Sequence, residues 1–337
     1  MNKLNQQNVI LSYQELSDLY AMKTFYEYLK ISDIKARITF SGYTAVRDRE
    51  NEILSDCNGM KWGEGSIDVI VRTFSDTSQS YGAGYVKLGI DAALLKNCVV
   101  PMDEKQKQEL REKYVKQNIQ GKRIITIGFS PMPVQDKLTL SGRTYHELTQ
   151  IVDTLCTSCF FYFVGDTPQD QIPQKYKEHI CCVNEQGVLK DFYALADITI
   201  NARNIERTDK RLNNFVEATE GGPLFMVPST NTKQYGYKQL VTAEAIKECS
   251  DANDIIDKIQ QYIIADNENK EVSNEISKKR AGHLLATRAK YLPIFESYLR
   301  ELLQIASLKN RTDLKVQSPQ IVITHPESDW IGYAELR

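Results

Sequence analysis

The residues with the clearest chemical potential lie between positions 203 and 217. In chain order they are Arg203, Arg207, Arg211, Asn213, Asn214 and Glu217. Guanidinium groups bind phosphate oxygens in pairs, and the first amides of a helix attract anions. A carboxylate three residues into such a helix can accept hydrogen bonds from a ribose diol. These residue types in this order therefore indicate a site for a nucleotide diphosphate.

A purely structural interpretation of the same residues stays open. Asn213 can cap the short helix that follows it, and Glu217 can interact with the positive end of that helix. The arginines can lie in solvent. The pattern alone does not decide between the two interpretations.

The elements around these residues predict a doubly wound sheet. Continuous apolar runs, typical of parallel strands covered on both faces, occur at residues 124–128, 160–165, 180–183, 198–201 and 224–227. Between them, residues 145–155 and 188–196 carry apolar side chains at helical spacing. Strand and helix in alternation favour βαβ units. Ligands of such sheets bind beyond the carboxyl ends of the strands, which is where Ser130 and residues 203–217 lie.

The first 120 residues show the same alternation less clearly. We expect strands at 9–11, 36–40 and 67–74, and helices at 16–31 and 78–88. The terminal stretch 277–308 has a long helical pattern, which Pro293 is expected to kink or split. The expected organisation is a reduced N-terminal Rossmann-like lobe (1–102), an exposed linker helix (103–120), a nucleotide-sugar-binding Rossmann-like lobe (121–285), and a terminal helix and tail (286–337).

Two segments carry a resemblance to a known family. In the first, Gly187, Leu189, Tyr193, Ala196 and Asp197 match a G-E-L-x-x-x-Y-x-x-A-D motif. In the second, Asn214 and Glu217 match the asparagine and glutamate of an H-N-P-L-E-P helix, and Gly222-Pro223 resembles the turn that follows it. Both motifs belong to the Kdo (3-deoxy-manno-octulosonate) transferases, which are GT-B glycosyltransferases. The chain resembles this family most specifically over residues 187–228.

The resemblance implies an α/β fold with two Rossmann-like lobes of the GT-B type. It implies transfer of a sugar from a nucleotide-activated donor to a saccharide or glycolipid acceptor, without metal, in lipopolysaccharide or cell-surface polysaccharide synthesis. Glu217 would hold the donor ribose. Asn213 and Asn214 would border its phosphates, and Ser130, Arg203 and Arg211 would lie beside the donor.

Departures from the family pattern keep a second hypothesis open. Asn213 replaces the histidine of the helix motif, Phe215 and Ala218 replace its prolines, and Val188 replaces the first glutamate. The first lobe is short and lacks the family's front portion. Three alternatives follow: the first lobe is reduced, a protein partner completes it, or the chain is a catalytically silent nucleotide- or partner-binding protein.

Glycosyl transfer requires a base that removes the proton of the acceptor hydroxyl, and the family resemblance implies that this base lies in the first lobe. The candidates are Glu64, in the loop Trp62–Gly65 before an expected strand, Glu15 and Asp18. Glu15 and Asp18 share one helix face, where such pairs are more often solvated.

Composition excludes several other classes of protein. The chain has 337 residues, and 42 Lys and Arg against 44 Asp and Glu give a net charge of −2. Such a balance offers no surface for nucleic acid. No apolar run approaches the roughly 18 residues of a membrane span, and the start has no secretion signal. We expect a cytoplasmic protein, with peripheral contact to the inner face of a membrane left open. The seven cysteines lack zinc-site spacing, so no metal or cofactor is expected.

Overall fold

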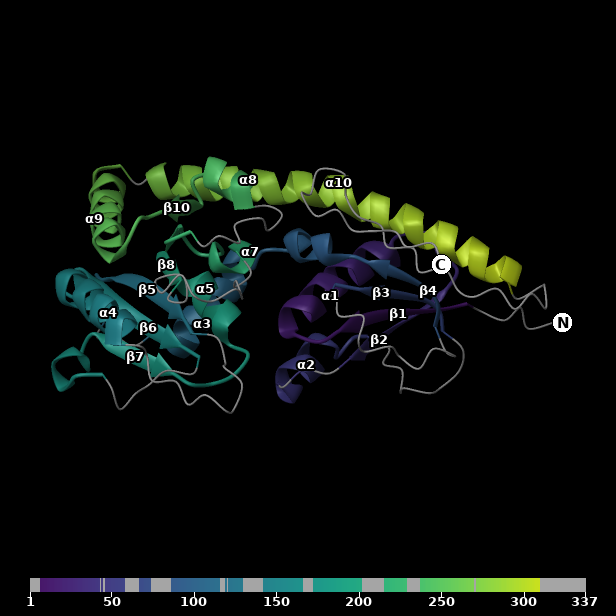
Figure 1. Cartoon of the computed structure of the whole chain (residues 1–337), viewed down its shortest axis with the longest axis horizontal. Helices are drawn as coiled ribbons and strands as arrows, with labels where there is room; N and C mark the ends of the chain where they lie inside the picture. Colours follow the sequence, from purple (N-terminus) through teal and green to yellow (C-terminus); the bar gives the residue numbers. More distant parts are fainter. Residues whose placement is uncertain are drawn as a thin grey trace. The chain divides into compact units, whose positions relative to one another are not determined.

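The chain forms two compact units, each built around one parallel sheet. The computed structural model describes residues 7–42, 44, 46–57, 67–73, 86–115, 119, 121–129, 142–165, 172–201, 215–228, 237–269 and 271–309. The first unit comprises residues 1–100 and 284–337, and the second comprises residues 101–283. Figure 1 shows the helices and strands of both units.

The sheet of the first unit has four strands in the order β2-β1-β3-β4. Its strands are β1 (Asn8–Tyr13), β2 (Arg37–Gly42), β3 (Ile67–Arg72) and β4 (Val86–Asp91). Leu11 of β1 lies between Phe40 of β2 and Val71 of β3 in the parallel register, and all three are buried. The strand order reverses between β1 and β3.

Helices accompany this sheet, and the first of them packs on it through apolar side chains at helical spacing. The elements are α1 (Leu16–Lys30), α2 (Arg47–Ile53) and the 3-10 helix η1 (Ala93–Cys98). Helix α1 buries Leu19, Met22, Phe25 and Leu29, which form one stripe facing the core. The ring of Phe25 lies 6.4 Å, centroid to centroid, from that of Phe295 in the terminal helix.

The sheet of the second unit has six strands in the order β10-β9-β8-β5-β6-β7. They are β5 (Arg123–Gly128), β6 (Cys159–Val164), β7 (Ile180–Val183), β8 (Ile198–Asn201), β9 (Leu224–Met226) and β10 (Ile246–Glu248). Successive residues of β5 and β6, such as Ile124 and Ile125 or Phe160 and Phe161, are all buried. Because neighbouring side chains point to opposite faces, both faces of this sheet are covered.

The second unit contains most of the helices that the structure describes. They are α3 (Glu104–Tyr114), α4 (Gly142–Leu155), the 3-10 helix η4 (Gln174–Tyr176), α5 (Leu189–Leu195), α7 (Phe215–Ala218), α8 (Tyr237–Thr242) and α9 (Ala252–Glu268). Helix α5 covers one face through Phe192 and Leu195, and Leu110 and Tyr114 of α3 pack against the same core. Helices α4 and α9 pack against each other.

The terminal helix α10 (Glu271–Lys309) begins in the second unit and ends in the first. Pro293 lies inside it, and the helix continues past this residue, so the expected split is wrong. The proline ring is exposed, whereas Tyr291, Leu292 and Phe295 on either side of it are buried. Packing of these side chains outweighs the backbone hydrogen bond that proline removes.

The expected fold class is confirmed as α/β, with two Rossmann-like lobes, a smaller first lobe and a long terminal helix. One expected element is wrong, because residues 86–88 belong to strand β4 rather than to a helix over 78–88. In β4, apolar Val86, Leu88 and Ile90 alternate with other residues, which is the period of a strand. The remainder of that expected helix, 78–85, lies outside the described residues.

Candidate functional site

The candidate site lies where the strand order of the second sheet reverses, between β5 and β8. From β5 the chain proceeds through β6 to β7 on one side, and then returns to β8, β9 and β10 on the other. Gly128 ends β5 and Asn201 ends β8, and the two residues are register partners. The connections that leave these strands diverge here, which makes this the point at which open parallel sheets bind ligands.

Gly128 allows helix α5 to pack closely against the end of β5. A Cβ atom on Gly128 would lie 2.1 Å from the hydroxyl oxygen of Tyr193 and 3.2 Å from Cδ1 of Leu189. Tyr193 is fully buried, at 1% exposure. Tyr193 and Leu189 both belong to the motif that carries the family resemblance, so these two motif residues pack helix α5 against the end of β5.

Two other residues of the same motif have structural roles away from Gly128. Gly187 has φ of 84°, a left-handed backbone conformation that glycine adopts without strain, in the turn before α5. Asp197 directly precedes β8 at the opposite, amino edge of the sheet, where its Oδ2 accepts a 2.7 Å hydrogen bond from the amide of Ile124. Burial raises the pKa of the Asp197 carboxyl, against the lowering effect of that amide. This part of the motif stabilises the sheet rather than the candidate site.

Glu217 lies on the short helix α7, which follows β8. Phe215, Val216 and Ala218 of this helix are buried, and Glu217 is half-buried with its Oε1 atom shielded from solvent. The ring of Phe215 packs against that of Tyr237, with 5.2 Å between centroids. Because α7 has one turn only, it depends on such tertiary contacts for its position.

The turn after α7 passes very close to the backbone at the end of α5. A Cβ atom on Gly222 would lie 2.0 Å from the carbonyl oxygen of Asp197, and one on Gly221 would lie 2.4 Å from that of Ala196. The amide of Gly221 donates a hydrogen bond to the carbonyl of Tyr193. The Gly-Gly-Pro turn thus joins α7 to the motif helix α5.

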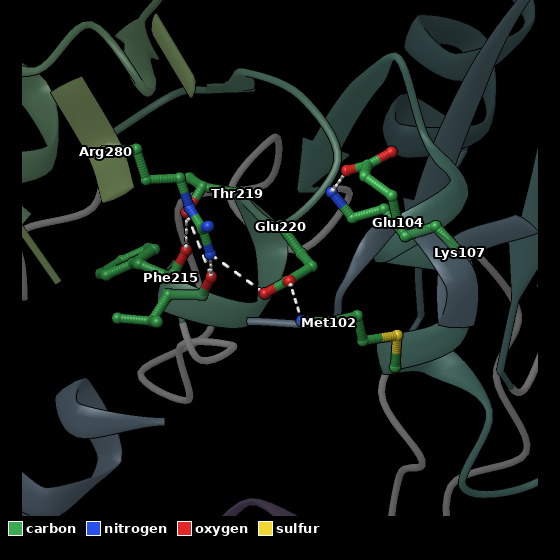
Figure 2. A network of polar contacts seen from close by, with 8 residues as sticks. Met102, Glu104, Lys107, Phe215, Thr219, Glu220 and Arg280 are labelled. Carbon is green, nitrogen blue, oxygen red and sulfur yellow. Dashed lines mark hydrogen bonds and ion pairs between the residues drawn. The ribbon is translucent and has the colours of Figure 1, made fainter. Parts of the chain in front are cut away.

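A buried polar network holds the same, carboxyl-terminal end of α7 (Figure 2). Arg280 of α10 donates from Nη2 to the carbonyl of Val216 (2.6 Å) and from Nε to Oγ1 of Thr219 (2.9 Å). The same Nη2 pairs with Oε2 of Glu220 at 3.1 Å. Oε1 of Glu220 accepts the amide of Met102 at 2.8 Å. Sequence patterns gave no sign of Glu220 or Arg280, because their partners are distant in the chain.

Most of the site residues predicted from the sequence lie outside the described residues. These are Glu64, Ser130, Arg203, Arg207, Arg211, Asn213 and Asn214. Ser130 follows Phe129, the first residue after β5, and the others of the second lobe fall between the end of β8 and the start of α7. Their roles stay predictions.

Among the predicted catalytic residues that the structure describes, Glu15 is exposed. It is the N-cap of α1, just after the carboxyl end of β1. Its amide donates to Oδ2 of Asp18 at 3.0 Å. The expectation that Asp18 is solvated is wrong: it is 1% exposed, pairs with Lys96 at 2.7 Å, and accepts a hydrogen bond from Thr73. A helix-capping role explains its burial.

A second buried carboxylate near this edge, Glu50, was not predicted. It accepts hydrogen bonds from the hydroxyl of Tyr13 (2.9 Å), from the amide and hydroxyl of Thr44 (both 2.9 Å), and from Arg47 (2.9 Å). Burial, followed by the hydrogen bond to Glu50, raises the pKa of Tyr13. Helix α2, which carries Glu50, is nearly all charged and shows no apolar stripe in the sequence, so no pattern pointed to it.

The described part of the chain contains neither a metal-ligand cluster nor a membrane-spanning helix. No group of three or more His, Cys, Asp or Glu side chains there is arranged to hold a metal ion. No helix within those ranges is long and apolar enough to cross a membrane.

Comparison with known proteins gives structural matches only. No family model matches the chain, and no curated protein matches its sequence. A putative UDP-N-acetylglucosamine 2-epimerase from Listeria monocytogenes aligns at 8% identity over 81% of this chain and 91% of its own, with a TM-score of 0.47. The wall teichoic acid polymerase TagF aligns at 9% identity over 90% of each chain, with a TM-score of 0.44.

A third match concerns the family resembled in sequence. The C-terminal CMP-Kdo binding domain of WaaA from Acinetobacter baumannii aligns at 13% identity over 52% of this chain and 96% of its own, with a TM-score of 0.38.

Proposed function

We propose that this chain is a glycosyltransferase that binds a nucleotide-activated sugar at the carboxyl ends of β5 and β8. The observation that carries the proposal is the placement of Glu217. Its position in the sequence matches the glutamate of a Kdo-transferase motif, which implies a role in holding the donor ribose. It lies on α7, the helix that follows β8, and β8 lies at the strand-order reversal of the second sheet.

The proposed donor contacts follow from chemistry. The Glu217 carboxylate accepts hydrogen bonds from the ribose hydroxyls, as a half-buried acceptor with one oxygen shielded from water. Arg203 and Arg211, with Asn213 and Asn214, are proposed to bind the diphosphate and to stabilise the negative charge that develops on it as the sugar leaves. Such stabilisation by arginine does not require a metal ion.

The proposed acceptor is a saccharide or glycolipid, and the proposed base that accepts its hydroxyl proton is Glu64 or Glu15. Glu15 is exposed at the carboxyl end of β1, where a side chain of the first unit can reach solvent and an incoming hydroxyl. A role in cell-surface polysaccharide synthesis follows from the same family resemblance and is part of the proposal.

Titration calorimetry with a panel of nucleotides and nucleotide sugars tests donor binding. We expect the best ligand to bind the Glu217→Gln variant about 10- to 100-fold more weakly, as for the loss of one charged hydrogen-bonding group. Glu268→Gln, an exposed carboxylate on α9 of the same unit, is the matched control and should bind as the wild type does. Equal affinity in the wild type and Glu217→Gln would contradict the assignment.

A donor-hydrolysis assay separates transfer from binding alone. The wild type should release the free nucleotide from its bound sugar nucleotide, and Glu64→Gln or Glu15→Gln should slow this release without weakening donor binding. Tight donor binding with no turnover, in the presence of a saccharide panel, would instead support the catalytically silent alternative.

A further inference from the structure

The chain passes between its two units twice, at residues 100–101 and 283–284. One buried carboxylate contacts the segments next to both passages. Glu220 accepts the amide of Met102, two residues after the first passage, and pairs with Arg280, four residues before Leu284. Both contacts lie within the second unit.

Arg280 also reaches the end of helix α7. Its Nη2 donates to the carbonyl of Val216, and its Nε donates to Oγ1 of Thr219. That hydroxyl in turn donates to the carbonyls of Phe215 (2.9 Å) and Val216 (3.1 Å). A cation beside the last carbonyls stabilises the end of a helix, and α7 is too short to be stable without such contacts.

We infer that the Arg280–Glu220 ion pair is a positioning element, which fixes α7 and its Glu217 to both segments that lead to the first unit. Arg280 is 6% exposed and Glu220 is 7% exposed. Every described contact of the pair is a directed hydrogen bond in a site shielded from water, where an unmatched polar group is costly. A shift of either passage therefore changes the contacts that hold α7.

The consequence for ligand binding rests on the proposed function, whereas the positioning of α7 does not. If a nucleotide binds at Glu217, its affinity depends on two residues that do not touch it. Glu220 and Arg280 are thus positioning residues. Their hydrogen bonds link the two segments at which the chain passes between the units to the helix that carries Glu217.

Hydrogen exchange without any nucleotide tests the positioning directly. The readout amides are Met102, Thr219 and Glu220, the last two of which donate to the carbonyls of Phe215 and Glu217. In Arg280→Met we expect exchange at these amides to accelerate at least 10-fold, while amides of β5 and β8 keep their wild-type rates. Lys279→Met is the matched control: this neighbour makes exposed ion pairs with Glu244 and Glu275, and its loss should leave all these rates unchanged.

Unchanged exchange at α7 and Met102 in Arg280→Met would overturn the inference, as would equal acceleration throughout the second unit. If Arg280→Met fails to fold, the double variant Arg280→Met/Glu220→Leu removes both charges and leaves none unmatched. Faster exchange confined to α7 and Met102 in this folded double variant supports the inference, and wild-type exchange there overturns it.

The nucleotide that binds best to the wild type then tests the link to Glu217. Arg280→Met should bind it about 10-fold more weakly, and Lys279→Met should bind it equally well. Loosened α7 with unchanged affinity would overturn this link. If the wild type binds no nucleotide, the proposed function fails, while the exchange result still decides whether the ion pair positions α7.

Discussion

The two sheets reverse their strand order in the same way but fill the reversal point with different side chains. Between β1 and β3, buried Asp18 is engaged by Thr73, Lys96 and the amide of Glu15. Between β5 and β8, Gly128 lies against the hydroxyl of Tyr193, and Asn201 ends the neighbouring strand. In the first unit the polar groups that we describe hold the fold together. In the second, the close approach of helix α5 to Gly128 holds the fold at this point, and the polar residues that follow β5 and β8 in the sequence are those for which we propose ligand binding.

This difference explains why the family resemblance is concentrated in the second unit. Gly187, Leu189, Tyr193 and Asp197 are explained by a turn, by packing on Gly128 and by a hydrogen bond to β5. A motif can therefore signal the fold of a binding lobe through residues that never contact the ligand. Within the described residues, Glu217 is the motif member for which we propose a role in binding.

We expect the largest effect from a substitution that disrupts the close packing of the second unit. In Gly222→Ala, the added methyl would lie 2.0 Å from the carbonyl oxygen of Asp197, and neither backbone can yield easily. We expect the second unit to lose about 3 kcal/mol of unfolding free energy, as measured by urea denaturation with segment-resolved hydrogen exchange. Gly282→Ala, in α10 with no atom within 4 Å of the added methyl, is the control and should be stabilising by about 0.5–1 kcal/mol. Equal stability of the two variants would show that close packing at the turn is not required.

The next largest effect concerns the buried polar groups at the point where the strand order of the first sheet reverses. Asp18→Asn weakens the ion pair with Lys96 and should cost about 2 kcal/mol, because Asp18 is buried. Glu15→Gln, on the same helix turn but exposed, should cost about 0.5 kcal/mol or less. Urea denaturation of both variants measures the difference. If Glu15→Gln costs as much as Asp18→Asn, burial does not distinguish the two carboxylates.

A smaller effect depends on pH and concerns the amino edge of the second sheet. Burial opposes ionisation of Asp266, but hydrogen bonds from Ser273 and the charge of Arg123 outweigh it and lower the pKa of this carboxyl below its ordinary value of 3.8. A lowered pKa contributes stability that is present above about pH 4 and is lost as the pH falls through the lowered value. Asp266→Asn should therefore cost about 1–2 kcal/mol at pH 7, and this cost should shrink below pH 4. Urea denaturation at pH 7 and pH 3 measures it, and a constant cost at both pH values would contradict the lowered pKa.

Strands in the second unit could be predicted because both faces are covered, which produces continuous apolar runs such as those of β5 and β6. The helices and strands of the first unit were harder to predict from the sequence. Strand β4 alternates apolar residues with Lys87, Gly89 and Asp91, and α2 has a single buried residue, Glu50. No local pattern distinguishes a short charged helix from an exposed loop. Strand β10 also escaped prediction, because its sequence Ile-Lys-Glu contains one apolar residue and therefore gives no apolar run.

The residues of the candidate site could likewise be predicted only where a local sequence motif contains them. Glu217 could be found, because a family motif surrounds it. Arg280 and Glu220 could not, since they are 60 residues apart and their importance arises only when α10 packs beside α7. Pro293 wrongly suggested a split in the same way, because the buried side chains on either side of it hold the helix continuous.

The central claim is that Glu217 accepts hydrogen bonds from the ribose of a bound nucleotide. A double-mutant cycle tests it by titration calorimetry, pairing the wild type and Glu217→Gln with the best-binding nucleotide and its 2′,3′-dideoxy analogue. The account predicts that removal of the hydroxyls weakens binding to the wild type about 10-fold or more and barely changes binding to Glu217→Gln. An equal loss of affinity in both proteins would mean that the ribose does not contact Glu217, and would contradict the account.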